Sequence, residues 1–178
     1  MKATGIVRRI DDLGRIVIPK EIRSTMHIRE SDPLEIYTGN SGEIVFKKYS
    51  AIGEMPTFAE KFVEILQKEI SAPVIVTDRD SVIAVSGLPK SEFIGKNLTE
   101  EAEKIIEKRA PFIQKGGPKT IAPIENTKNE AKIISPVITN GDISGSVIIF
   151  NSESKIDIDI CAKMANLASK FISALIEN

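Results

Sequence analysis

The strongest constraint on the fold lies near the start of the chain, where residues 5–23 read GIVRRIDDLGRIVIPKEIR. Two short runs, 5–10 and 15–18, are rich in β-branched residues and alternate with the period of two that is typical of a strand. Between them, residues 11–14 favour a turn, because aspartate hydrogen-bonds its own backbone and glycine adopts positive φ at little cost. The pattern predicts two strands that carry arginines on both faces.

The second strand is expected to end at Pro19, which cannot donate a ladder hydrogen bond and whose fixed φ suits the first position of a helix over 20–26. Guanidinium groups on such short, rigid elements offer planar donors to phosphate oxygens and guanine edges. The predicted DNA contacts are Arg8, Arg9, Arg15 and Arg23. The alternative is that these arginines form weak surface salt bridges with Asp11, Asp12 and Glu21.

Charge is distributed unevenly along the chain. The first 29 residues hold seven Lys or Arg against three Asp or Glu, a net of +4, whereas the whole chain nets −1, so the remainder carries −5. A basic end suits a polyanion, although a charge of this size also fits an ordinary solvated surface. The one cysteine, Cys161, excludes an intrachain disulfide and a multi-cysteine zinc site. With no signal-like start and no apolar run of membrane length, we expect a cytoplasmic protein that does not associate with membranes.

A second β-hairpin is predicted over 34–38 and 43–48, around a glycine-containing turn. The unit at 1–50 would thus contain about fifty residues without a metal or disulfide, a size at which one core is usually too small to stand alone. We expect it to fold as a homodimer.

After a linker at 51–56, a second domain is predicted over 57–178. Its expected elements are a helix over 58–70, a hairpin over 73–78 and 81–86, a helix over 99–110, a loop over 111–131 with at most one short strand near 120–124, a hairpin over 132–139 and 143–150, and a helix over 156–176. This order is typical of an α+β fold with an antiparallel sheet between helices.

The basic N-terminal stretch closely resembles the AbrB-type swapped-hairpin DNA-binding domain of bacterial transition-state regulators. The matching residues are Lys2, 4–8 (TGIVR), Asp11, 13–19 (LGRIVIP), Glu21 and Arg23, with a second cluster at 34–37 (LEIY) and 47–49 (KKY). The resemblance implies that two chains interleave their hairpins into one β-rich, MazE-like barrel. It carries the family's DNA-contacting arginines over to Arg8, Arg15 and Arg23, with Arg9 and Lys2 as supporting cations.

The element order of 57–178 is similar to that of a GAF domain, a small-molecule-sensing module of bacterial regulators, with a PAS-like sensor as the nearest rival. In a GAF-like domain the long loop after the middle helix borders the ligand cavity. Position therefore makes Phe93, Phe112 and Ile113 candidates for lining a pocket, and Asn126 and Lys128 candidates for its polar groups. The ligand is unidentified, and no cofactor or metal is predicted.

The helices that contain Phe58 and Ile160 have apolar stripes wider than packing on one sheet requires. The excess predicts a second contact between subunits, which together with the dimer at 1–50 would give a homotetramer. The alternative is that both helices cover opposite parts of one sheet.

The sequence therefore predicts a homo-oligomeric transcription regulator, an activator or repressor that binds double-stranded DNA with degenerate sequence preference. The resemblance implies a role in sporulation or stationary phase. No catalytic residue is predicted, and we expect no enzyme activity. Two alternatives stay open: an antitoxin-type repressor with the same DNA-binding hairpin, and a thiol enzyme that uses Cys161 in the GAF-like half.

Overall fold

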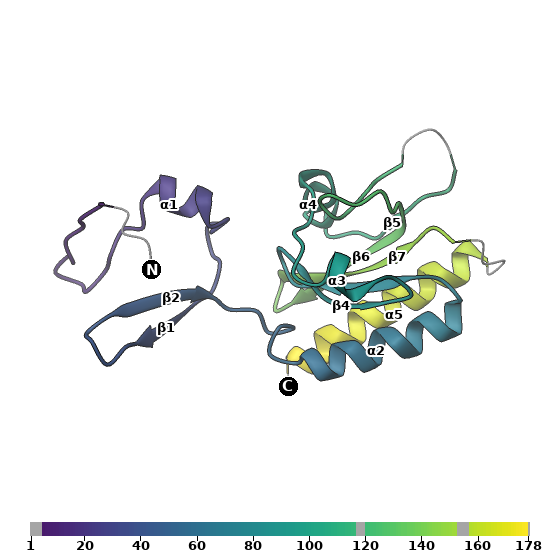
Figure 1. Cartoon of the computed structure of the whole chain (residues 1–178), viewed down its shortest axis with the longest axis horizontal. Coiled ribbons are helices and arrows are strands. Elements are labelled where there is room, and N and C mark those ends of the chain that lie inside the picture. The colour runs from purple at the N-terminus through teal and green to yellow at the C-terminus, as the bar shows by residue number, and fades with distance from the viewer. Residues whose placement is uncertain (1–4, 117–119, 153–156, 178) are drawn as a thin grey trace. The chain divides into compact units, whose positions relative to one another are not determined.

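The computed structural model describes residues 5–116, 120–152 and 157–177 of the chain (Figure 1). It divides into two compact units, Met1–Tyr49 and Ser50–Asn178. The segment predicted as a linker, 51–56, belongs to the second unit. There Ile52 is only 2% exposed and packs in the core, because its side chain lies against the sheet.

The first unit contains one short helix and one hairpin. Helix α1 (Lys20–Thr25) follows Pro19, whose φ of −58° already suits a helix. Strand β1 (Leu34–Thr38) pairs antiparallel with β2 (Ile44–Lys48). These three elements agree with the predicted helix and second hairpin.

Residues 5–18 differ from the prediction, since no β-ladder forms among the described residues of this segment. Only the turn is present: Asp11 N donates to Arg15 O at 3.1 Å, and Gly14 N donates to Asp11 O at 3.1 Å. A strand needs a neighbour for its hydrogen bonds and a surface for its side chains. Among the described residues of one chain no ladder partner is supplied, so the expected strands do not form.

The second unit is built on a five-stranded antiparallel sheet of order β4-β3-β7-β6-β5. The strands are β3 (Val74–Thr77), β4 (Val82–Ser86), β5 (Phe112–Ile113), β6 (Ala131–Thr139) and β7 (Asp142–Phe150). The turn between β6 and β7 is the predicted Asn140-Gly141 pair, with φ of 50° and 85°. Two positive φ values are what this tight reversal requires.

Helices cover both faces of this sheet. Helices α2 (Pro56–Ile70) and α5 (Ile158–Ile176) lie side by side on one face, α2 against β3 and β4 and α5 against β6 and β7 (Figure 1). The short helices α3 (Lys90–Phe93) and α4 (Glu100–Ile106) belong to the core on the other face. The two helices therefore cover different parts of one sheet, as in the alternative given above, and both lie on the same face of it.

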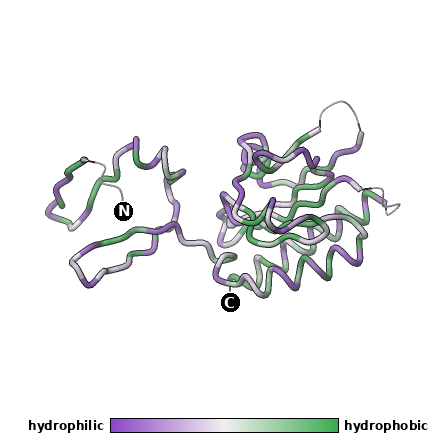
Figure 2. The backbone as a smooth tube through the Cα atoms, in the orientation of Figure 1, coloured by the Kyte–Doolittle hydropathy of each residue, from purple (hydrophilic) through white to green (hydrophobic). Residues whose placement is uncertain are grey.

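Two hydrophobic cores result from the alternation of side chains along the strands. In β7, Ile149 joins the core under α2 and α5, and Ile148 joins the core on the opposite face. Figure 2 shows hydrophobic residues concentrated along the sheet and alternating with hydrophilic ones along α2. The buried hydroxyls of Thr77 and Ser146 satisfy each other at 2.7 Å.

Three local details differ from the sequence-based prediction. Strand β5 forms within the expected loop, and α3 was not predicted. The strand position differs as well: near 120–124, where at most one short strand is expected, an isolated bridge joins Leu98 to Ile124.

Gly145 marks the closest approach of β7 to β3, and a side chain there should destabilise the second unit. In a Gly145→Ala variant the new Cβ would overlap the carbonyl oxygen of Thr77 and lie 2.7 Å from Ile52 Cδ1. Because a backbone atom cannot swing aside, we expect the free energy of unfolding to fall by about 3 kcal/mol. Urea denaturation followed by circular dichroism measures the loss.

The matched control is Gly39→Ala, whose Cβ would meet only the flexible side chain of Glu43, at 3.2 Å. It should leave the denaturation midpoint nearly unchanged. Equal midpoints for the two variants would contradict this account of the contact between β3 and β7.

Candidate nucleic-acid interface

The turn at residues 11–15 is organised by one carboxylate. Asp11 Oδ1 accepts hydrogen bonds from Leu13 N at 3.0 Å and from Arg15 N at 2.7 Å, while Oδ2 accepts one from Arg15 Nε at 2.7 Å. Aspartate is favoured in turns because its short side chain reaches backbone donors a few residues ahead. One side chain thus closes the turn and also orients the arginine that follows it.

The same contacts perturb the ionisation of Asp11. The backbone N–H of Arg15 and then its guanidinium group hold the pKa of this carboxyl below its usual value. A lowered pKa means that the contact is present at neutral pH and is lost only as the pH falls through that lowered value. The pair is exposed to water, so it fixes geometry more than it adds stability.

The other predicted arginines are exposed and make no ion pair with a described residue. Arg8 and Arg9 precede the turn, and Arg23 lies in the last turn of α1. Arg15 uses only Nε in its ion pair, and its side chain is 69% exposed. The salt-bridge alternative is thus realised for Arg15 with Asp11 alone among the described residues. Lys2, the remaining predicted contact, lies outside them.

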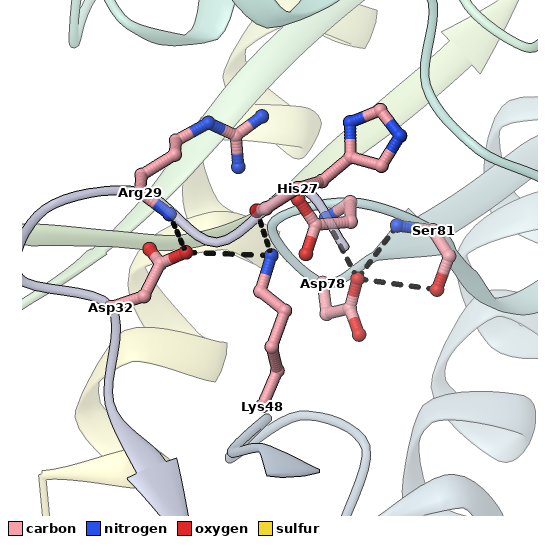
Figure 3. Close-up of polar contacts among 7 residues, drawn as sticks. His27, Arg29, Asp32, Lys48, Asp78 and Ser81 are labelled. Atoms are coloured by element: carbon pink, nitrogen blue, oxygen red, sulfur yellow. Dashed lines mark hydrogen bonds and ion pairs between the residues drawn. The ribbon is translucent and has the colours of Figure 1, made fainter. Parts of the chain in front are cut away.

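A second polar cluster supports the segment between α1 and the hairpin (Figure 3). Lys48 Nζ donates to His27 O at 2.7 Å and lies 3.4 Å from Asp32 Oδ2, which also accepts a hydrogen bond from Arg29 N at 2.7 Å. Asp32 has a 1% exposed side chain, so these partners replace the water that its Oδ2 would otherwise bind. The cluster fixes the loop after α1 to strand β2.

Sequence reasoning missed this cluster. The available signal was Asp32 before Pro33, a pair that favours a turn. Nothing local shows that Lys48 of β2 closes it. Figure 3 also draws the turn of Asp78 and Ser81 between β3 and β4, which belongs to the second unit.

The first unit leaves much of its apolar surface in water. Val7, Leu13 and Val17 are 86%, 70% and 73% exposed. The hairpin adds Ile36, Ile44 and Phe46 to the exposed apolar residues. A soluble single domain rarely exposes so many large apolar side chains, which instead indicates a surface that another chain covers.

Of the five residues predicted to hold a ligand, Phe93 and Phe112 belong to one core, and the others lie elsewhere. Phe93 is buried edge-on against Phe150 with ring centroids 5.8 Å apart. Phe112 and Ile113 pack into cores on opposite faces of the sheet. Asn126 and Lys128 are exposed in the loop before β6. A pocket built from these five residues stays a prediction.

The described residues offer neither a membrane-spanning helix nor a cluster of metal ligands. No helix among them is long and apolar enough to span a bilayer. Within the same residues, no three His, Cys, Asp or Glu side chains gather as a metal ion would need. The single cysteine, Cys161, is buried in α5.

Comparison with curated proteins relates both units to bacterial regulators. Stage V sporulation protein T of Bacillus subtilis (strain 168) is 38% identical over 179 residues, which cover 99% of each chain. Transition state regulatory protein AbrB of the same organism is 57% identical over 49 residues, 28% of this chain and 50% of that protein. The chain therefore spans only half the length of AbrB.

Solved structures identify the fold of the second unit. The GAF domain of an Acinetobacter phosphoenolpyruvate-protein phosphotransferase is 12% identical, covers 73% of this chain and 84% of that one, and has a TM-score of 0.53. A type II free methionine-R-sulfoxide reductase from Thermoplasma acidophilum is 14% identical, covers 70% of this chain and 94% of that one, and has a TM-score of 0.53. At these identities the similarity shows a GAF-like fold alone.

Two family models divide the chain between them. Residues 7–53 match the model described as antidote-toxin recognition MazE, bacterial antitoxin. Residues 54–177 match the model described as stage V sporulation protein T C-terminal, transcription factor. With that match and the relative that is similar over its whole length, the chain belongs to the stage V sporulation protein T family of transcription regulators, with an AbrB-like first unit and a GAF-like second one.

Proposed function

We propose that Arg8, Arg9, Arg15 and Arg23 bind double-stranded DNA, and that the chain thereby activates or represses promoters of sporulation or stationary-phase genes. One observation carries the proposal: three of these arginines are exposed without an ion pair to a described residue, and the fourth is held in a fixed geometry by Asp11. Guanidinium groups presented in this way suit phosphate oxygens and guanine edges. The cytoplasm, where the DNA lies, is the proposed location.

Recognition by so few arginines makes the sequence preference degenerate. Phosphate contacts position a protein on DNA but do not read sequence. The segment 5–23 contains no Asn or Gln, the side chains that best recognise adenine edges. Discrimination among promoters would then depend on DNA shape and deformability as well as on a few guanine contacts.

Two copies of the first unit would form the binding surface. The exposed Val7, Leu13 and Val17 favour a partner that covers them, and a second copy of the same segment supplies strands of matching pattern. Interleaving two chains would bury these side chains and duplicate the arginines across a two-fold axis. Duplication also raises affinity, because both sets bind one duplex.

A second contact between copies would use α2 and α5. Between these helices lies an apolar groove of about 280 Å³, lined by Phe62, Ile65, Leu66, Glu69, Met164, Leu167, Ala168 and Phe171. Ile65 and Leu167 are each 63% exposed. The rings of Phe62 and Phe171 stack at 5.8 Å and form a flat apolar floor. The same face of a second copy would cover this groove and, with the first dimer, produce a tetramer.

We propose that the second unit has a binding role and does not catalyse a reaction. The relatives that match are regulators, and Cys161, the residue a thiol enzyme would need, is buried and therefore closed to a substrate. The antitoxin alternative has support from the MazE-type model over residues 7–53. The match of 54–177 to a transcription-factor model favours regulation instead.

Substituting Arg15 should weaken DNA binding and lower its salt dependence. If about six phosphates are neutralised, affinity should fall on the order of a thousandfold between low and physiological salt. In Arg15→Ala we expect a loss of about 1–3 kcal/mol of binding free energy, and a salt slope smaller by about one if its main contact is a phosphate. Fluorescence anisotropy of labelled promoter DNA at several salt concentrations gives both quantities.

The control is Lys61→Ala, which removes an exposed cation from α2 in the second unit. It should bind like the wild type. Absence of binding at low salt, or an equal loss in both variants, would contradict the assignment of DNA contacts to the first unit.

Introducing a charge into the groove between α2 and α5 should disrupt the second contact. Leu167→Glu would bury a carboxylate in an apolar interface, so sedimentation equilibrium should show half the mass of the wild-type assembly. Because Leu167 is mostly exposed in the single chain, the circular dichroism spectrum should not change. Lys108→Glu, at an exposed lysine just after α4 and outside the groove lining, is the control and should keep the wild-type mass. An unchanged mass for Leu167→Glu would contradict the proposed interface.

A further inference from the structure

A pocket on the side of α5 away from the groove is not explained by DNA binding or by assembly. Its volume is about 300 Å³, and it lies between α5, the outer part of β6 and the segment before β5. The polar lining consists of Arg109, Ser135, Asn166, Ser169, Lys170 and Ser173. The pocket is distinct from the one predicted around Phe93, since none of its lining residues is shared with that set.

The short edge strand explains why this pocket exists. Strand β5 pairs with β6 only at Ile133 and Ile134, so β6 continues from Ser135 to Thr139 without a strand on that side among the described residues. Helix α5 forms one wall beside this open edge. Opposite it, the Arg109 side chain extends to the turn after β6, where it donates to the carbonyl oxygen of Gly141.

Four polar residues of α5 face this space at helical spacing. Asn166, Ser169, Lys170 and Ser173 lie at positions i, i+3, i+4 and i+7, which form one stripe of a helix. The hydroxyls are already engaged: Ser169 and Ser135 share a hydrogen bond of 2.9 Å, and Ser173 donates to Ile138 O. The side chains of Asn166 and Lys170 have no hydrogen-bond or ion-pair partner among the described residues.

The remaining donors define the charge of the pocket. Lys170 and Arg109 are cations, and no acidic side chain is among the described residues that line the pocket. Asp142 lies 3.7 Å from Arg109, but both side chains are more than half exposed, so water weakens that pair. Two cations line this pocket although the second unit as a whole is acidic, with 15 Lys or Arg against 18 Asp or Glu, a net of −3. A positive pocket in an acidic unit attracts anions.

We propose that this pocket binds a small anionic metabolite through a phosphate or carboxylate group. Lys170 supplies a point charge, the Asn166 amide adds a hydrogen-bond donor, and Arg109, whose Nη1 binds Gly141 O and whose Nη2 lies near Asp142, adds positive charge. The volume is at the lower end for ligand sites, which excludes a dinucleotide and fits a compound of few atoms. The ligand would contact the flank of α5 that carries Asn166 and Ser173, and Leu167 belongs to the groove lining, so the same helix carries both the ligand and the proposed subunit interface.

The test measures thermal unfolding of the full chain without DNA, so its result is independent of the proposed DNA function. The probes are inorganic phosphate and citrate, each compared with sodium chloride at equal ionic strength. We expect one probe to raise Tm saturably, by about 3–6 °C at tenfold excess over its Kd. Phosphate would identify a phosphate-bearing ligand, and citrate a carboxylate-bearing one.

Substitutions of two lysines on α5 show whether the probe binds in this pocket. Lys170→Gln should weaken probe binding by about tenfold or more, because a charge-assisted hydrogen bond is lost, and Lys170→Arg should restore most of it. The matched control is Lys163→Gln, seven residues earlier on the same helix face and roughly 10 Å away along the axis. It should bind like the wild type. No shift with either probe, or equal shifts in Lys170→Gln and the wild type, would overturn the proposal.

Discussion

The first unit cannot bury its own apolar side chains, and this constraint governs the rest of the molecule. Residues such as Val7 and Val17 alternate with arginines along a segment that forms a turn but no ladder with any other part of the chain that the structure describes. The strands that present the arginines would therefore exist only when a second chain pairs with them. Folding, assembly and the formation of the DNA-binding surface become one event, and concentration enters the stability of that surface directly.

The elements that local pattern controls could be predicted from the sequence. Helix α2 follows from its period of apolar residues, and the β6–β7 hairpin from the Asn140-Gly141 turn. Strand β5 could not be predicted, because a two-residue strand is defined by its pairing with β6 and not by its own sequence. Helix α3, with four residues, is too short to show a period.

The candidate sites also divide into those that the local sequence indicates and those that depend on tertiary packing. The exposed arginines stand in a recognisable motif, and the pairing of Arg15 with Asp11 is local enough to have been foreseen as an alternative. The contact of Lys48 with His27 joins residues 21 apart, and the pocket beside α5 joins Arg109 to Lys170. Such sites depend on tertiary packing, so no spacing in the sequence reveals them. The five residues chosen by position for a ligand were distributed by the sheet over both of its faces and the loop.

The outer part of β6 has a consequence beyond ligand binding. An uncovered strand edge is a template on which foreign strands can add and begin aggregation. Here Pro136 removes one N–H from that edge, Ser173 occupies the carbonyl of Ile138, and the charged Arg109 side chain binds at the turn beyond it. These three features make the outer edge of β6 a poor template for a further strand, so the proposed self-association of this protein would be left to its other surfaces.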